Sequence, residues 1–199
     1  GIVEESASPD FRPGDAVVAT GCGTSETHWG GYAQLARLKA DWVTPVPTGM
    51  SLVHAMGVGT AGFTAMQSVM SLEDHGAKPG GRAIAVTGAA GGVCSVSIAI
   101  LAKLGYTVVA STGRRELDGY LRGLGAHDII DRAELAAASK RPLESERWGG
   151  AIDSVGGDTL SGLLRTRPLR RKCPTGPQCL LNPGDRVRQR ARADCGIGG

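Results

Sequence analysis

The sequence predicts an α/β protein built on an open, doubly wound parallel sheet. Two observations predict it. Short apolar runs alternate with helical periodicities between residues 83 and 166, and a glycine-rich turn, GAAGGV, follows the first of these runs. A strand, a tight glycine turn, a helix and a second strand within about thirty residues form the unit from which such sheets are assembled. The ligand crevice of such a sheet lies beyond the carboxyl ends of its strands.

The elements alternate along the chain. AIAVT (83–87) consists of small and β-branched residues, which suits a strand buried on both faces. Apolar spacing then predicts a helix up to Gly105, a strand over 107–111 and an amphipathic helix over 115–126. HDIID (127–131) is the third strand. After a loop, GAIDSVGG (150–157) is the fourth strand, and DTLSGLL starts another helix.

The first eighty residues have a different pattern. GIVEES and DAVVAT read as strands, and the Pro13–Gly14–Asp15 turn between them has residues suited to a reversal of the chain. Residues 51–76 have apolar side chains at helical spacing, including Met56, Met66 and Met70. We expect these methionines to fill a core rather than to form a ligand surface.

The GAAGGV turn has the chemistry of a pyrophosphate site. Gly91 and Gly92 lack a Cβ, so backbone N–H groups can approach a phosphate at the positive end of the following helix. This predicts a Rossmann-type dinucleotide-binding domain. Cys94 stands where the fingerprint carries its last glycine, so we expect its sulfur to push the helix off the strand at about 1–3 kcal/mol. We interpret Cys94 as relaxed constraint rather than as a redox site.

The end of the second strand indicates which dinucleotide is bound. A site for NAD places Asp or Glu there to accept from the ribose hydroxyls. This chain instead has Ser111-Thr112-Gly113-Arg114-Arg115. Hydroxyls and a guanidinium suit a 2′-phosphate, which favours NADPH. The alternative is a pair of solvated arginines at the start of a helix.

Composition excludes several other classes of protein. The five cysteines include no CxxC pair and the four histidines form no cluster with ligand spacing, so we expect no metal site. No apolar run is long enough to span a membrane, and no signal peptide is evident at Gly1. These features predict a cytoplasmic protein with reduced thiols and no membrane partner.

Residues 167–199 differ from the rest of the chain. They contain eight Arg or Lys but two acids, and all eight aromatic residues lie at or before Trp148. Three interpretations stay open: an arginine-rich arm for nucleic acid, a disordered end, or an out-of-frame translation. The arm is disfavoured because it lacks aromatics that could stack on bases, so we expect no nucleic-acid partner. For the third interpretation, a one-nucleotide shift in the codons of residues 168–171 permits Pro-Tyr-Gly-Ala.

Seven motifs in this order carry a family resemblance over residues 1–166: WGGYAQ, ADWVTPVP, GTAGFTAM, VTGAAGGV, YTVVASTGR, LGAHDIIDR and IDSVGG. They resemble the zinc-free quinone oxidoreductase branch of the medium-chain dehydrogenase/reductases, and are most similar to the NADPH-dependent acrylyl-CoA reductase group. The resemblance implies a partial GroES-like, β-rich catalytic domain (1–48), an incomplete Rossmann domain with its leading helices (49–166) and the tail (167–199). Relative to that family the chain looks truncated at both ends.

The resemblance also implies cofactor contacts and an activity. The residues expected to contact NADPH are Thr60, Thr64, Ala90, Gly91, Gly92, Val93, Ser111 and Arg114. The two threonines would lie towards the nicotinamide, or else simply pack within their helix. The expected activity is hydride transfer from NADPH to the conjugated double bond of an acrylyl-CoA-like thioester, with no catalytic residue assigned and no metal. The alternatives are an NADPH:quinone reductase and a non-catalytic NADPH-binding fragment. Full-length members of the family are expected to be homo-oligomers.

Overall fold

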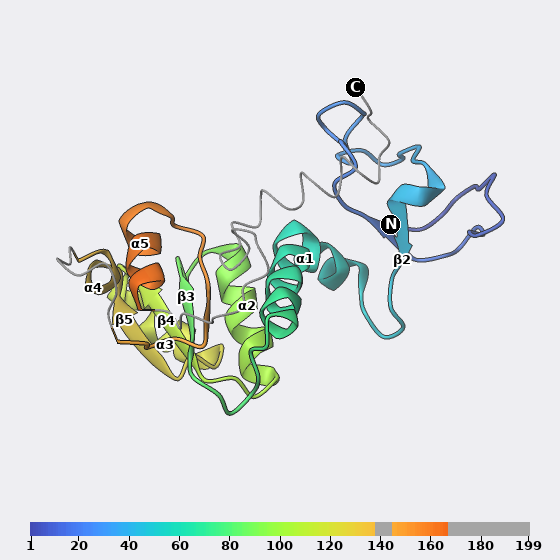
Figure 1. Ribbon diagram of the computed structural model, residues 1–199. Coiled ribbons are helices and arrows are strands. Elements are labelled where there is room, and N and C mark those ends of the chain that lie inside the picture. Colours follow the sequence, from blue (N-terminus) through green and yellow to red (C-terminus); the bar gives the residue numbers. More distant parts are fainter. Residues whose placement is uncertain (138–144, 167–199) are drawn as a thin grey trace, which may run out of the picture. The chain divides into compact units, whose positions relative to one another are not determined.

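The computed structural model describes residues 1–137 and 145–166. They belong to two compact units, Gly1–Phe63 and the part that starts at Thr64. Figure 1 shows the sheet and its helices in the second unit. The domains expected from the sequence divide at residue 48, and that assignment stays a prediction. The basic tail predicted over 167–199 lies outside the described residues.

The first unit contains a small antiparallel sheet. Strands β1 (Val17–Ala19) and β2 (Val43–Pro45) pair with Val18 opposite Thr44, and a short helix, η1 (Ala40–Trp42), precedes β2. Gly14 has a φ of +96°, as the predicted turn requires. The strand expected at GIVEES is reduced to one bridge between Ile2 and Ala16.

Helix α1 (Leu52–Asp74) corresponds to the helical pattern over 51–76 and is interrupted at Gly59, whose φ is +42°. The expectation that its methionines fill the core is wrong for this chain. Met56, Met66 and Met70 are 61%, 42% and 52% exposed. The buried stripe of α1 consists instead of small residues, including Ala65 and Val69. A nearly all-apolar helix has no polar face, so spacing alone does not tell which of its sides is buried.

The second unit is built on a parallel sheet with the strand order β5-β4-β3-β6. Its strands are β3 (Ile84–Thr87), β4 (Val108–Thr112), β5 (Asp128–Asp131) and β6 (Gly150–Ile152). Its further helices are α2 (Gly92–Lys103), η2 (Arg115–Leu117), α3 (Asp118–Gly123), α4 (Arg132–Ala136) and α5 (Gly157–Arg165). The predicted α/β fold with a doubly wound parallel sheet is confirmed.

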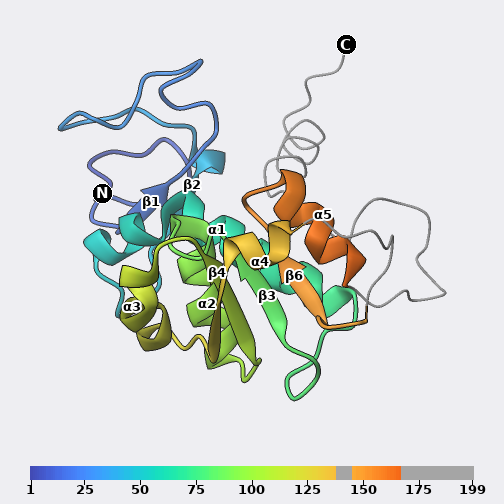
Figure 2. The same cartoon turned by 90° about the vertical axis from the view of Figure 1, so that its left-hand side faces the viewer.

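Successive strand residues pack into two different cores, as the two-residue period of a strand requires. Ile84 and Val86 of β3 pack with α1, α2 and α3 on one face of the sheet. Ala85 between them packs with Leu135 of α4 and Leu163 of α5 on the other face. Figure 2 shows these two layers of helices on opposite sides of the strands. Both faces are covered, which explains why all four residues of β3 are apolar or fully buried.

Helix α4 was not expected, because the sequence was interpreted as a loop after the third strand. The helix has only five residues, and the Asp131 side chain caps it by accepting a hydrogen bond from the Ala133 N–H. Asp131 and Glu134 have the spacing of a capping box, which is the local signal that predicts such a start.

Candidate functional site

The carboxyl ends of the four strands bring the sequence-predicted turn and loops to one edge of the sheet. Strand β3 lies between β4 and β6, so the chain leaves its central strand in two opposite directions. Such a reversal of strand order is the topological switch point at which open α/β sheets bind ligands. Four segments follow the strands at this edge: Gly88–Gly91, 113–114, Arg132 and 153–156.

The glycine turn is compact and leaves backbone exposed at the start of α2. Gly88 has a φ of +58°, and Gly91 is the N-cap of α2. A Cβ on Gly91 would lie 3.2 Å from the Gly88 carbonyl oxygen, so this position has little room for a side chain. No side chain caps α2, its first turn has no acid, and Gly91 and Gly92 are exposed. The turn therefore fits an anionic group such as a pyrophosphate.

Ala90 and Val93, the other two predicted contacts in this turn, are partly buried beside the two exposed glycines. The Ala89 N–H, one residue earlier, donates to the Ser111 carbonyl oxygen at 3.2 Å. This bond ties the turn to the end of β4. The structure thus brings six of the eight predicted residues, 90–93, Ser111 and Arg114, to the carboxyl edge of one sheet.

A buried polar network joins the ends of β3 and β6. The Thr87 hydroxyl donates to the Asp153 carboxylate at 2.5 Å, and the N–H groups of Val155 and Gly156 donate to the same carboxylate at 3.4 and 2.9 Å. The Ser154 N–H donates to Thr87 Oγ1 at 3.3 Å. Asp153 is only 6% exposed, so its charge is balanced by these donors. Sequence reasoning did not assign this network, although Asp153 and Ser154 lie in the IDSVGG motif.

Cys94 belongs to the same junction. Its side chain is 1% exposed, and its Sγ donates to Ser154 Oγ at 3.2 Å. Burial raises the pKa of the Cys94 thiol, the hydrogen bond with Ser154 lowers this pKa in part, and the Asp153 charge raises it further. The sulfur packs among the apolar side chains of β3, β4 and α2. The energetic cost expected for a side chain at this position stays a prediction.

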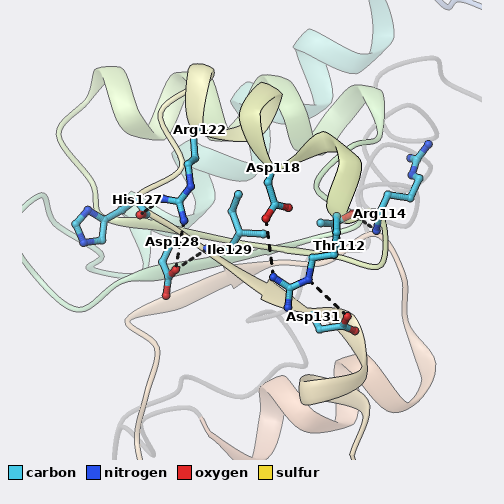
Figure 3. A network of polar contacts seen from close by, with 9 residues as sticks. Thr112, Arg114, Asp118, Arg122, His127, Asp128, Ile129 and Asp131 are labelled. Atoms are coloured by element: carbon cyan, nitrogen blue, oxygen red, sulfur yellow. Dashed lines mark hydrogen bonds and ion pairs between the residues drawn. The ribbon is translucent and has the colours of Figure 1, made fainter.

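The end of β4 contains the predicted hydroxyls and Arg114. Ser111 is 1% exposed, and its hydroxyl has no hydrogen-bond partner among the described residues. The Thr112 hydroxyl accepts from the Arg114 N–H at 3.1 Å, which tightens the turn after the strand. The Arg114 side chain is exposed and points away from Asp118 and Asp131 (Figure 3). An unpartnered buried hydroxyl is uncommon and is often found at sites that bind a ligand.

Arg115, the next residue, has a different environment. Its guanidinium lies 3.9 Å from the carboxylates of both Asp118 and Asp131, the two acids that Figure 3 labels on either side of it. The two adjacent arginines of the sequence are therefore not equivalent. Arg115 stays near acids of its own domain, whereas Arg114 projects from the strand end.

Thr60 and Thr64 lie on α1. Thr60 is exposed and belongs to the first unit, whereas Thr64 is 7% exposed and belongs to the second. The Thr64 carbonyl oxygen accepts from the Ser68 hydroxyl at 2.9 Å. Neither threonine hydrogen-bonds to the strand-end segments within residues 1–137 and 145–166. Their contact with a nicotinamide stays a prediction.

The described residues were also searched for a metal site and for a membrane-spanning helix. Within them, no group of three or more His, Cys, Asp or Glu side chains is arranged to hold a metal ion. Nor does any helix in the described part of the chain have the length and apolar character needed to cross a membrane.

Comparison with known proteins gives the family. Acrylyl-CoA reductase AcuI of Ruegeria pomeroyi is 56% identical over 164 residues, which is 82% of this chain and 50% of that protein. The structure of YhdH of Escherichia coli K-12 with bound NADPH matches 98% of this chain and 68% of its own, at 40% identity and a TM-score of 0.80. The chain belongs to the medium-chain dehydrogenase/reductase family. The resemblance to the acrylyl-CoA reductase group, expected from the motifs, is confirmed by these relatives.

A third relative has a different cofactor and name. YhfP of Bacillus subtilis is named as a candidate quinone oxidoreductase, and its structure with NAD bound has a TM-score of 0.80 to this chain at 42% identity, over 84% of this chain and 51% of its own. The small antiparallel sheet of the first unit fits part of a GroES-like domain. The chain spans about half the length of the curated relatives it matches. No protein-family model matches it.

Proposed function

We propose that the protein is an NADPH-dependent oxidoreductase that reduces the conjugated double bond of an acrylyl-CoA-like thioester. The observation that carries the cofactor assignment is the carboxyl end of β4, where the exposed Arg114 follows the strand and no acid stands at the ribose position. A guanidinium there favours a 2′-phosphate, whereas an NAD site would carry Asp or Glu. The NADPH bound to E. coli YhdH supports this assignment, and the NAD bound to YhfP opposes it.

The residues that hold the cofactor divide by the part of it they meet. The backbone of Ala90, Gly91, Gly92 and Val93 at the start of α2, where the two glycines are exposed, binds the pyrophosphate. Ser111 and Arg114 bind the adenosine 2′-phosphate, and Thr60 and Thr64 lie towards the nicotinamide. Bound NADPH supplies a hydride. The chain orients it, and no side chain is assigned as a proton donor.

The substrate assignment rests on the 56% identity to AcuI. In the proposed reaction the hydride is added to the β-carbon of the conjugated thioester and a solvent-derived proton to the α-carbon, so NADPH is oxidised to NADP⁺ as the double bond becomes single. No metal takes part in this proposal. We also propose a cytoplasmic location, which the free thiols of Cys22 and Cys94 support, and homo-oligomers for the longer members of the family.

Turnover by the purified 199-residue chain tests this function. The assay follows NADPH absorbance after addition of acrylyl-CoA, and propionyl-CoA, the saturated thioester, is the matched control that has no double bond to reduce. We expect NADPH to be oxidised when acrylyl-CoA is added but not when propionyl-CoA is added. Oxidation at the same rate with both thioesters would contradict the proposed chemistry.

The similarity to YhfP favours a second candidate, an NADPH:quinone reductase. Adding a quinone in place of the thioester distinguishes the two, because a quinone reductase turns over the quinone faster. NADPH binding without oxidation of either acceptor would favour the third candidate, a non-catalytic NADPH-binding fragment.

A further inference from the structure

The amino ends of β3 and β6 border a hollow that lies at the opposite end of the sheet from the glycine turn. Its volume is about 340 Å³, within the range of about 300–1,000 Å³ that is typical of small-ligand sites. This amino-end hollow has mostly apolar walls, formed by the backbone of Gly76, Gly81 and Gly149 and by the side chains of Ala77 and Ile84. None of these residues is among the predicted NADPH contacts.

The end of α1 shapes one side of the amino-end hollow. Gly76 has a φ of +87°, and its N–H donates to the Glu73 carbonyl oxygen at 2.8 Å. The Ala77 N–H donates to the Leu72 carbonyl oxygen at 3.0 Å. This pair of bonds is a Schellman motif, which glycine completes without strain. Because these two carbonyl oxygens already accept a hydrogen bond, they oppose an anion in the hollow less than free carbonyl groups would.

The segments before β3 and β6 shape the other side. A Cβ on Gly149 would lie 2.8 Å from the Arg82 carbonyl oxygen and 3.2 Å from the Arg82 Cβ. A Cβ on Gly81 would lie 3.0 Å from the Lys78 carbonyl oxygen. Neither position has room for a side chain, so backbone forms this part of the wall.

Three charged side chains border the amino-end hollow: those of Lys78, Arg82 and Glu146. Arg82 Nη1 donates to the Glu146 carboxylate. Lys78 is exposed, and within residues 1–137 and 145–166 it forms no ion pair. Two cations and one carboxylate leave a net charge of +1 beside the apolar wall. A ligand that matches both features combines one negative charge with an apolar surface.

We propose that the amino-end hollow binds a small monoanion in which a carboxylate is joined to an apolar body. Lys78 binds the carboxylate through its ammonium group, and the N–H groups of Arg82 that do not reach Glu146 donate to the same ligand. The apolar body covers Ala77 and Ile84 and removes water from them. A dianion is disfavoured because the Glu146 carboxylate stays at the border of the site. This site goes beyond the proposed oxidoreductase function and does not depend on it.

An NMR titration of the 199-residue chain with benzoate tests the proposal, and benzamide is the matched neutral probe. We expect benzoate to shift the amide resonances of Gly81 and Gly149 and to bind at least about threefold more tightly than benzamide. Added salt should weaken benzoate more than benzamide, because it screens exposed charges. Unshifted amides of Gly81 and Gly149, or equal affinities for the two probes, would overturn the proposal.

Two variants should change the benzoate affinity in opposite directions. Lys78→Gln removes a cation, so it should weaken benzoate about threefold. Glu146→Gln removes the carboxylate that repels the ligand and occupies Arg82, so it should strengthen benzoate about threefold. A disturbed fold would weaken binding in both variants, so weaker binding in Glu146→Gln would overturn the assignment of the charges.

Each variant has a control outside the amino-end hollow. Lys103→Gln removes an exposed lysine at the end of α2. Glu134→Gln removes an acid that is also paired with an arginine and is 50% exposed, against 44% for Glu146. Both controls should leave the benzoate affinity unchanged. Shifts in affinity as large as those of Lys78→Gln and Glu146→Gln would show that the net charge of the chain, and not this site, attracts benzoate.

Discussion

Two regions at the same edge of the sheet use polar residues in opposite ways. Where β3 and β6 end, Thr87, Asp153, Ser154 and Cys94 are bonded to one another, and all but Ser154 are buried. Where β4 and β5 end, Arg114 and Arg132 are exposed, and neither forms an ion pair with a carboxylate of the described residues. In the first region the polar groups find their hydrogen-bond partners within the protein, whereas in the second the charged groups remain available to a ligand.

The physical reason lies in burial. A buried carboxylate without donors is costly, so the β3–β6 junction is stable only when each of its partners is present. Exposed arginines are hydrated, so they lower the stability of the fold little when no anion is bound. Changes in the first region should therefore alter the free energy of unfolding, and changes in the second should alter ligand affinity.

The largest expected effect is that of Asp153→Ala. It leaves the Thr87 hydroxyl and the N–H groups of Val155 and Gly156 without their acceptor, so we expect a loss of about 3 kcal/mol in the free energy of unfolding. Urea denaturation of the 199-residue chain measures it. Asp158→Ala, which removes an exposed acid in the first turn of α5, should cost below about 1 kcal/mol. Equal losses of unfolding free energy in the two variants would show that the buried network stabilises the fold no more than an exposed acid does.

Gly88→Ala comes next. At a φ of +58° a side chain is strained, and its Cβ would lie 2.5 Å from Ser154 Oγ. Because the serine hydroxyl can move at the cost of its bonds, we expect a loss of about 1–2 kcal/mol. Gly119→Ala is the control, since it lies in α3 with open space around it and should be neutral or slightly stabilising. Stability equal to that of the unmodified chain in Gly88→Ala would contradict the close packing of this turn.

The Cys94 thiol should make the junction sensitive to alkaline pH. Because burial raises its pKa, the unfolded chain releases this proton at a lower pH than the folded chain. The corresponding stability is fully present below about pH 9 and is lost as the pH rises above that value. Denaturation midpoints from pH 8 to about pH 10 should fall less in Cys94→Ala than in the unmodified chain. Cys22→Ala, at an exposed thiol, should reproduce the unmodified curve. A Cys94→Ala curve parallel to it would refute the assignment.

Arg115→Gln should have the smallest effect of the four. Its two ion pairs are 3.9 Å long and its side chain is 62% exposed, so the free energy of unfolding should change by less than about 0.5 kcal/mol. Its NADPH affinity should stay within about twofold, which is below 0.5 kcal/mol. A selective loss of NADPH affinity would place Arg115 in the subsite and remove the contrast between the paired and unpaired arginines.

The sequence predicted the strands and the glycine turn of the second unit because local pattern and tertiary role agree there. Residues 84–87, for instance, are small or β-branched and are all buried, as a central parallel strand requires. The β3–β6 junction was not predicted. Its partners, Thr87 and Asp153, are 66 residues apart, and only the strand order makes them neighbours.

Arg132 was missed for a similar reason. Arg132 ends the LGAHDIIDR motif, but its place beside Gly113 follows from the parallel pairing of β4 and β5 and not from the motif itself. The strand ends could have been compared once a parallel sheet was predicted, since their carboxyl ends meet at one edge. By contrast, the exposure of Met66 and Met70 could not be foreseen, because α1 carries apolar side chains of its own on most of its sides.

The most direct test of the account is a phosphorus NMR titration of NADP⁺ bound to the 199-residue chain. A free phosphate monoester releases its second proton near pH 6. If exposed arginines at the β4–β5 end bind the 2′-phosphate, its resonance should keep the dianionic position to a pH at least about one unit lower, because adjacent cations favour the charged form. A bound 2′-phosphate that titrates like that of free NADP⁺ would contradict the account.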